Sequence, residues 1–293
     1  MIVSNLIGGL GNQLFQYAFG FAQAARHGVE LRLATDLFTD YRLHQGYELA
    51  RVFAVHPKEA SASDLKALLG IWRHPALRRA LSRCAPGLWR AGMAAFEPAS
   101  GWWPGVGRLS ADAYVHGYWQ SERYFAEQAI ALRRSLQFRH PPSADNSRWL
   151  ERIGRCVSVS VHIRGGDYVS SAKNRRIYAG CGPEYYGAAL DRLCAAHAGA
   201  RFFAFSDDVS WARQCLGDRL DAVEIIDLNR GTESWNDMRL MSHCQHHVIA
   251  NSSFSWWGAW LGERPGTTII APRQWYVAPG RCLDLVPERW LRL

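Results

Sequence analysis

Lysine, paired cysteines and long apolar runs are scarce in this sequence of 293 residues. The seven cysteines are scattered and form no CxxC pair, which argues against a zinc site or a disulfide framework. A reducing, cytoplasmic compartment fits this pattern best. No basic residue precedes Arg26, so no secretory signal is predicted. The uncharged stretches 1–25 and 240–262 are rich in amide, histidine or glycine residues, and neither is the apolar run of about 20 residues that a membrane-spanning helix needs.

Positive charge dominates, and it comes almost entirely from arginine. The formal net charge is +8, and only three of the 34 basic residues are lysine. Codon usage explains the overall count, but an arginine inside a motif can grip phosphate with its planar fork. The hydrophobic content of 48% excludes intrinsic disorder as the overall state and predicts a sizeable core.

Alternating strand and helix patterns predict an α/β protein with parallel sheets. A strand at 2–7, a glycine turn, an apolar helical pattern ending at His27-Gly28 and a strand at 29–34 form a βαβ unit. A single helix is predicted over 122–136. The linker-like Pro141-Pro142-Ser143 precedes a second α/β series. We therefore expect two Rossmann-like domains, residues 1–145 and 146–293.

The first candidate site is the turn Gly8-Gly9-Leu10-Gly11-Asn12-Gln13, between the first strand and its helix. Backbone N–H groups at such a turn can bind an anion at the helix N-terminus. The third glycine of the dinucleotide fingerprint is missing, and no Gly-Lys-Ser/Thr follows. A plain tight turn explains the segment equally well.

The second candidate site is His162-Ile163-Arg164, at the end of a strong strand. Alternate residues of a strand share a face, so His162 and Arg164 should point the same way. Arg164 suits a diphosphate, and His162 can bond a base or a ribose. The structural alternative pairs Arg164 with Asp167.

Two further segments also follow strands. In Ser206-Asp207-Asp208 the carboxylates can hold a metal, act as a base or accept from guanine, unless Ser206 or Asp208 merely caps the next helix. The turn Asn251-Ser252-Ser253-Phe254 offers a second anion site with hydroxyls and N–H groups. Three tryptophans beyond it, Trp256, Trp257 and Trp260, are predicted to be core residues. For the nearby histidines, His243, His246 and His247, we favour packing and hydrogen bonding over a metal site, since no ligand set is complete.

Two anion sites, an arginine and a carboxylate pair at strand ends fit a nucleotide-diphosphate ligand. The ordered set 8–18 (GGLGNQLFQYA), 162–168 (HIRGGDY), 205–208 (FSDD) and 250–261 (ANSSFSWWGAWL) resembles the α-1,2-fucosyltransferase family, glycosyltransferase family 11, and its bacterial members. The segments 117–125 (GYWQSERYF) and 184–186 (EYY) also match it.

The resemblance implies a GT-B-like fold, in which two Rossmann-like domains face a cleft. It implies that residues 1–145 form the acceptor side and residues 146–293 the sugar-donor side. GDP-β-L-fucose would be the co-substrate, the 2-hydroxyl of a galactoside the acceptor, and the reaction would invert the anomeric carbon. A metal or other cofactor is not expected, nor is a nucleic-acid partner.

The resemblance also implies roles for individual residues. Arg164 would grip the β-phosphate, His162 would lie against the guanosine, and Asp207 or Asp208 would read guanine. The other residues expected to bind the sugar donor are Gly9, Leu10, Gly11, Asn12, Ser206, Asn251, Ser252, Ser253 and Phe254. Asp167 and Glu184 are the candidates for the catalytic base. The family usually carries a second arginine where this chain has Gly165, which is expected to weaken donor affinity.

Three alternatives are a nucleotide-dependent oxidoreductase, a non-catalytic glycan- or nucleic-acid-binding protein, and a fucosyltransferase of different regiochemistry. A further question concerns residues 70–96, which contain arginines, tryptophans and leucines but no acidic residue. The arginines are Arg73, Arg78, Arg79, Arg83 and Arg90. Such a segment can lie on an anionic membrane, as an enzyme acting on a lipid-linked glycan would, but a solvated face packed by its tryptophans is favoured.

Overall fold

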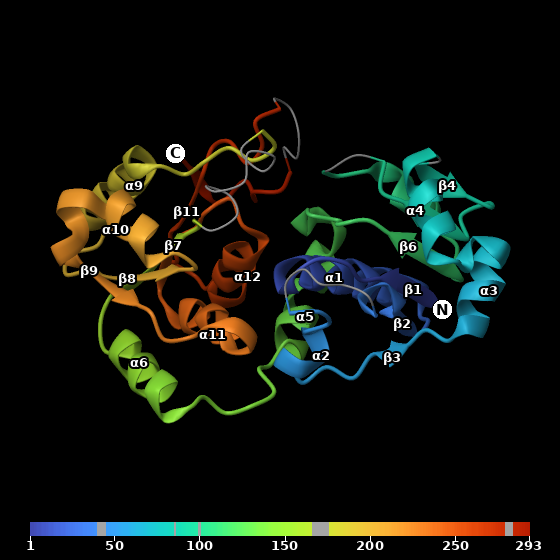
Figure 1. Cartoon of the computed structure of the whole chain (residues 1–293), viewed down its shortest axis with the longest axis horizontal. Coiled ribbons are helices and arrows are strands. Elements are labelled where there is room, and N and C mark those ends of the chain that lie inside the picture. Colours follow the sequence, from blue (N-terminus) through green and yellow to red (C-terminus); the bar gives the residue numbers. More distant parts are fainter. Residues whose placement is uncertain (40–44, 85, 99–100, 166–175, 279–283) are drawn as a thin grey trace. The chain divides into compact units, whose positions relative to one another are not determined.

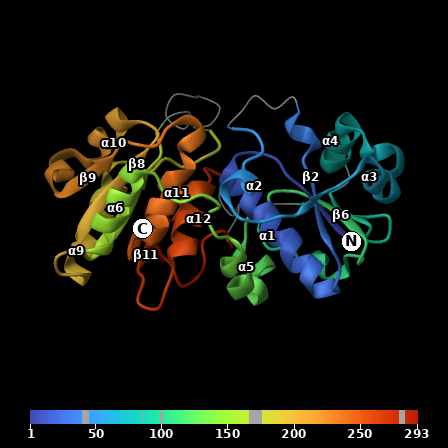
Figure 2. The ribbon, with the colours of Figure 1, turned by 90° about the horizontal axis from the view of Figure 1, so that it is seen from below.

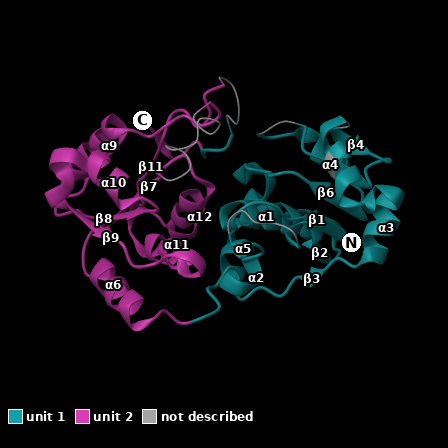
Figure 3. Ribbon diagram, viewed as in Figure 1, with its two compact units in different colours: residues 1–140, 282–287 teal, residues 141–281, 288–293 magenta. Residues whose placement is uncertain are grey.

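The computed structural model describes residues 1–39, 45–84, 86–98, 101–165, 176–278 and 284–293 (Figure 1). The chain folds into two compact units (Figure 3). Unit 1 comprises residues 1–140 and 282–287, and unit 2 comprises residues 141–281 and 288–293. The break after His140 lies close to the expected Pro-Pro linker, whereas the return of 282–287 to unit 1 has no counterpart in the predicted division at 145.

Unit 1 is built on a sheet with the strand order β3-β2-β1-β6-β5-β4. Only the β4–β5 pair among the described strands of this sheet is antiparallel. The strands are β1 (Ile2–Asn5), β2 (Leu31–Ala34), β3 (Lys58–Glu59), β4 (Gly87–Trp89), β5 (Ala94–Phe96) and β6 (Ala113–His116). The α-helices are α1 (Leu10–His27), α2 (Leu49–Val52), α3 (Ala62–Leu69), α4 (Pro75–Cys84) and α5 (Ala129–Ser135). Short 3₁₀ turns are η1 (Asp36–Phe38), η2 (Gly70–Arg73), η3 (Pro104–Arg108), η4 (Glu122–Tyr124) and η5 (Ala126–Gln128).

Helices cover both faces of the first sheet (Figures 1 and 2). α1 lies on one face, where the Ser4 hydroxyl donates to the Gln16 carbonyl oxygen at 2.8 Å. α3 and α4 lie on the other, where Leu65, Leu69 and Leu81 pack with strand residues in one buried cluster. Helix α1 ends where predicted, because Gly28 adopts the left-handed conformation (φ 63°) and its N–H bonds the last carbonyls.

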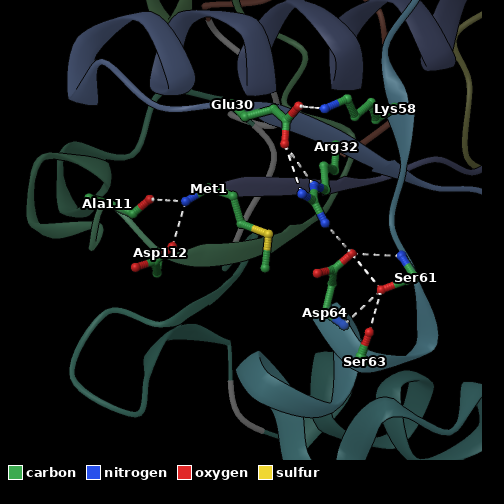
Figure 4. Close-up of polar contacts among 9 residues, drawn as sticks. All are labelled: Met1, Glu30, Arg32, Lys58, Ser61, Ser63, Asp64, Ala111 and Asp112. Carbon is green, nitrogen blue, oxygen red and sulfur yellow. Dashed lines mark hydrogen bonds and ion pairs between the residues drawn. The ribbon is translucent and has the colours of Figure 1, made fainter.

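Polar contacts link the start of β1 and the strands β2 and β3 to neighbouring segments (Figure 4). Arg32 of β2 pairs with Glu30 and, at 2.7 Å, with Asp64 in the first turn of α3. Asp64 also forms a capping box with Ser61, which fixes the start of α3.

Unit 2 repeats the architecture with a parallel sheet in the order β12-β11-β10-β7-β8-β9. The strands are β7 (Ser158–Ile163), β8 (Arg201–Ser206), β9 (Val223–Ile226), β10 (His246–Val248), β11 (Ile269–Ala271) and β12 (Leu291–Arg292). The α-helices are α6 (Ala144–Gly154), α9 (Pro183–Ala196), α10 (Val209–Leu216), α11 (Trp235–His243) and α12 (Ser253–Gly262). Two 3₁₀ turns are η6 (Gly217–Ala222) and η7 (Gly231–Glu233).

The core of unit 2 lies between its sheet and its helices. Valines of β7 pack with Tyr186 and Leu190 of α9 and with Ala212 of α10 on one face. α12 contributes Trp256, Trp257 and Trp260, which are fully buried as predicted. The two units confirm the predicted α/β class with two Rossmann-like domains.

The arginine-rich segment 70–96 is partly a core element. Arg78 is fully buried, so it belongs neither to a membrane-binding face nor to a solvated one. Trp72 and Trp89 pack edge to face, 6.0 Å apart, against the buried cluster of unit 1. This packing agrees with the favoured structural interpretation of the segment. Within the described ranges, no helix combines the length and apolarity needed to cross a membrane.

Candidate functional site

The predicted site segments lie at the two points where strand order reverses. In unit 1 the order reverses between β1 and β6, and in unit 2 between β7 and β10. Open α/β sheets bind ligands outside the carboxyl ends of the strands at such points. The glycine turn follows β1, His162 and Arg164 end β7, and the serine-rich turn follows β10. Ser206–Asp208 ends β8, the next strand beside β7.

Arg164 is held by a neighbouring carboxylate. Its Nη1 lies 2.7 Å from Oδ2 of Asp207, and both side chains are about a quarter to a third exposed (25% and 33%). The other oxygen of Asp207 accepts the backbone N–H of Gly165 at 2.9 Å. Asp207 therefore fixes both the guanidinium and the backbone beside it. Among the described residues Arg164 thus has a carboxylate partner, Asp207. The structural alternative, a pair of Arg164 with Asp167, stays a prediction. Asp167 lies outside the described residues.

His162 is a buried, neutral imidazole beside the serine-rich turn. Its ring centroid lies 6.0 Å from that of Phe254, and it is only 6% exposed. Burial, followed by the charge of Arg164, lowers the pKa of His162 to about 3. Its Nδ1 is buried with no hydrogen-bond partner among the described residues. An uncharged ring in this position can offer packing and one hydrogen bond to a ligand, but no positive charge.

Asp208 and Ser206 form a helix cap. Asp208 Oδ1 accepts the Trp211 N–H at 3.0 Å and so caps α10. The Ser206 hydroxyl accepts the Asp208 N–H at 3.0 Å and donates to the Asp208 carbonyl at 2.8 Å. The helix-cap alternative is thus correct for Asp208, and Asp207 is the carboxylate that faces Arg164.

The N-terminus of α12 has no cap from its own N-cap residue. The Ser252 side chain makes no capping hydrogen bond, while Ser253 and Phe254 form the first turn and are half-buried. Asn251, expected to bind the sugar donor, is instead 2% exposed. Its amide N–H groups go to the carbonyl oxygens of Ala179 and, at 3.3 Å, Trp275. Asn251 therefore orders the turn, and its expected contact with the sugar donor stays a prediction.

The N-terminus of α1 is already met by a carboxylate. Gly9 is the N-cap residue, and the Leu10 N–H lies close enough to the Glu48 carboxyl to lower its pKa. Glu48 is 4% exposed, and burial raises its pKa although Arg51 pairs with it at 2.9 Å. Gly11 is buried. An anion at this turn would have to compete with Glu48, so the two predicted anion sites are not equivalent.

Amide side chains connect the glycine turn to the rest of unit 1 by hydrogen bonds. Asn12 accepts a hydrogen bond from Gln120 at 2.9 Å, so this predicted residue lies beside the segment that follows β6. Gln13 is fully buried and binds both the Gly8 carbonyl and the backbone N–H of Glu48, at 3.0 and 2.9 Å. Sequence reasoning missed Glu48, which stands outside any motif, whereas Gln120 lies inside the noted segment 117–125.

Glu184 is exposed in the first turn of α9. The two tyrosines beside it are structural. Tyr185 donates to the Ile249 carbonyl at 2.6 Å, and Tyr186 donates to the His162 carbonyl at 3.1 Å. They anchor α9 to the ends of β7 and β10.

The histidines near β10 serve packing and hydrogen bonding, as favoured. His247 Nδ1 lies 2.8 Å from the Ser160 hydroxyl, and His246 Nδ1 accepts the Thr268 N–H at 3.0 Å. In the part of the chain that the structure describes, no three His, Cys, Asp or Glu side chains group as a metal site.

Comparison with known proteins identifies the family. The model of the family described as glycosyl transferase family 11 matches residues 107–281. An alpha-1,2-colitosyltransferase of Escherichia coli is 33% identical over 301 residues, covering 100% of this chain and 99% of the relative. The chain belongs to glycosyl transferase family 11. This membership confirms the resemblance noted in the motifs.

Two further family and fold relatives are more distant. The O-antigen biosynthesis glycosyltransferase WbnK of Escherichia coli is 30% identical over 136 residues, 46% of this chain and 44% of the relative. The crystal structure of NodZ alpha-1,6-fucosyltransferase soaked with GDP-fucose superposes with a TM-score of 0.51 at 14% identity, covering 89% of this chain and 91% of that chain. The likeness to NodZ, which bears on the fold alone, confirms the predicted GT-B-like class.

Proposed function

We propose that this family 11 glycosyltransferase moves L-fucose from GDP-β-L-fucose to the 2-hydroxyl of a galactoside, with inversion, forming an α-1,2 linkage. The observation that carries the proposal is the placement of Arg164 and the uncapped α12 N-terminus at one reversal point, between β7 and β10. A guanidinium and oriented N–H groups are what a diphosphate leaving group requires.

Charge development explains how this arrangement accelerates transfer. As the bond between the anomeric carbon and the phosphate oxygen breaks, its electron pair moves to the diphosphate and positive charge grows on the sugar. Arg164 stabilises the leaving oxygen, and one preorganised donor of this kind is worth roughly 3–4 kcal/mol. The acceptor oxygen then bonds to the anomeric carbon from the opposite face, and its proton passes to a base, for which Asp167 and Glu184 are the candidates. Because the leaving group is good, the proposal needs neither a divalent metal nor a strong base.

Asp207 orients Arg164 in this proposal. Its two oxygens hold the Arg164 guanidinium and the Gly165 N–H, so the fork is fixed before the substrate arrives. His162 and Phe254, 6.0 Å apart, form a wall for the nucleoside, while Ser252 and Ser253 line the diphosphate. Asp167 and Glu184 are kept as candidates for the base.

A second sugar is a specific competitor. The relative matched over 100% of this chain is named for colitose, which lacks the 3-hydroxyl that fucose carries. An enzyme that hydrogen-bonds this hydroxyl rejects the deoxy sugar strongly, whereas one that merely accommodates it discriminates weakly.

The test is a direct comparison of the two sugar donors. Purified protein is given GDP-fucose or GDP-colitose with a β-galactoside, and the product linkage is determined by NMR. The proposal expects higher kcat/KM with GDP-fucose and an α-linkage at oxygen 2. A preference for GDP-colitose would overturn the proposed donor sugar but not the proposed linkage. A product substituted elsewhere on galactose would overturn the proposed regiochemistry.

The acceptor in this proposal is a galactose-containing unit of a surface polysaccharide, free or lipid-linked, modified in the cytoplasm. The name of the WbnK relative, an O-antigen biosynthesis glycosyltransferase, supports this class. Membrane attachment through residues 70–96 is the less favoured part, since Arg78 is buried and the tryptophans are packed. Binding to anionic liposomes at low salt that disappears at high salt would establish attachment.

A further inference from the structure

A row of hydrogen-bonded, buried polar side chains crosses unit 1 on the face covered by α4. Arg78 of α4 is fully buried and pairs with Asp36 of η1. Its Nη1 lies 3.3 Å from the Tyr114 hydroxyl and 3.5 Å from Oδ1 of Asn5. The Tyr114 hydroxyl lies 3.2 Å from Nδ1 of His116, the last residue of β6. None of the expected site residues belongs to this chain of contacts.

The order of these contacts fixes where the His116 proton lies. A guanidinium can only donate, so Tyr114 accepts from Arg78. Tyr114 is fully buried, and burial raises its pKa above the ordinary value, so it keeps its own proton. Among the described residues the remaining partner of that hydroxyl is His116 Nδ1. Leaving a buried hydroxyl proton unbonded is costly, so Tyr114 donates to Nδ1 and the proton of the neutral ring is on Nε2.

The Nε2 atom of His116 keeps some exposed surface, although the residue as a whole is only 9% exposed. It makes no hydrogen bond within the described residues, so it can bond to a ligand. His116 stands beside Asn5, where β6 meets β1 and the strand order reverses. This is the point at which α/β sheets bind ligands.

The ring is uncharged at neutral pH. Burial, followed by the charge of Arg78, lowers the pKa of His116 to about 4. On β5, the Phe96 ring lies 5.7 Å away. The charged neighbour there, Glu97, gives its backbone N–H to the His116 carbonyl, while its carboxylate accepts the N–H groups of Tyr118 and Trp119. A neutral donor suits a hydroxyl or ring oxygen better than a phosphate, which the cationic Arg164 suits.

We propose that His116 determines acceptor specificity by donating a hydrogen bond from Nε2 to an oxygen of the acceptor glycan. The segment after His116 supplies matching chemistry, because Gln120 reaches Asn12 and Tyr118 presents a 45% exposed aromatic ring. Amides and aromatic faces are common partners of sugar hydroxyls and sugar rings. Arg78 and Tyr114 act through His116 as positioning residues. The inference rests on the proposed function only for the identity of the glycan.

The proton position is tested without turnover. Long-range ¹H–¹⁵N NMR of the full chain with labelled histidine is expected to show His116 neutral at pH 7, with Nε2 protonated and Nδ1 bare. Tyr114→Phe is expected to remove this bias, because the phenolic donor is lost. A neutral ring with the proton on Nδ1, or a charged ring at pH 7, overturns the proposal.

The specificity role is tested with two substitutions at one position. His116→Phe removes the donor, whereas His116→Gln keeps an N–H at a similar reach. We expect the acceptor KM to rise about tenfold in His116→Phe, the value of one net hydrogen bond, and to stay within about threefold in His116→Gln. The KM for GDP-fucose is expected to change less than about twofold in both. Equal losses in the two variants, or a rise confined to the GDP-fucose KM, contradict the role.

Deoxygenated galactosides identify the bonded oxygen. One deoxy position is expected to weaken binding to the wild type but not to His116→Phe, as measured by saturation-transfer NMR with acceptor alone. If no deoxy position weakens binding to the wild type alone, His116 does not hydrogen-bond to the glycan. If the wild type fails to use GDP-fucose, the proposed function is wrong, while the NMR experiments still decide the role of His116.

Discussion

Asp207 and Arg164 form an ion pair across the neighbouring strands β8 and β7, with Oδ2 and Nη1 2.7 Å apart. The same carboxylate binds the Gly165 N–H, so one aspartate controls both the cation and its backbone. The proposed leaving-group stabilisation depends on this control. A point charge without a fork cannot reproduce it.

We expect Arg164→Lys to lower kcat/KM about a hundred- to a thousandfold while the fold survives, since lysine keeps the charge and loses the fork. Steady-state kinetics and a thermal melt measure both quantities. Arg201→Lys is the matched control, because Arg201 is exposed and pairs with Glu224 away from the site. If a folded Arg164→Ala protein keeps most of its kcat/KM, Arg164 has no role at the leaving group.

Gly165 is required by close packing. A Cβ at this position would lie 2.7 Å from the Asp208 Cβ and 3.1 Å from the Trp211 ring. We expect Gly165→Ala to lower the free energy of unfolding by about 1–3 kcal/mol, as overpacking does. We expect Gly165→Arg, which restores the usual family residue, not to tighten GDP-fucose binding. Gly180→Ala is the control, because a Cβ there meets no atom of the described residues within 4 Å. Equal melting temperatures for Gly165→Ala and the wild type would refute the packing argument.

The local sequence was enough to predict the residues that close a strand and those that repeat along a helix. Arg164 and His162 were recognisable because polar residues close an apolar strand, and the three tryptophans of α12 because apolar residues repeat along a helix. The helix expected over 122–136 was wrong in part. The segment begins with η4 and η5, and Phe125 between them has φ −135°, which no α-helix accommodates. α5 starts only at Ala129.

Contacts between distant segments could not be read from the sequence. Glu48 meets Leu10, and Asn251 binds Ala179, because the fold brings separate loops together. Both side chains interact with backbone groups of distant segments, and such contacts leave no periodic pattern in the sequence. The motif residue Asn251 consequently had a structural role that its position beside two serines did not reveal.

Asp237 makes stability depend on pH. Burial raises its pKa to about 7, although Asn229 donates to it at 2.8 Å. Between about pH 4 and pH 7 the folded state holds a proton that the unfolded state has lost. This contribution is therefore fully present below about pH 4 and is lost as pH rises through 7, at up to about 1.4 kcal/mol per unit.

Urea unfolding across this pH range tests the effect with Asp237→Asn. The variant keeps the oxygen that accepts from Asn229 and cannot ionise, so its stability relative to wild type should increase from pH 4 to pH 7. Asp145→Asn, at an exposed acid paired with Arg148, is the control and should show no such trend. A difference between Asp237→Asn and wild type that is independent of pH would contradict the assignment.

Catalysis is expected to proceed without a divalent metal, since Arg164 and the α12 N-terminus supply the counter-charge. Extensive treatment with EDTA should leave most of the activity. Complete loss that Mn²⁺ or Mg²⁺ restores would instead assign Asp207 and Asp208 as ligands.

Release of isotopically labelled GDP from GDP-fucose by the purified protein tests the central claim most directly. The account predicts release well above the enzyme-free rate, a further increase when a β-galactoside is added, and loss of both in Arg164→Lys. Turnover of UDP- or CMP-sugars with GDP-fucose left intact would contradict it.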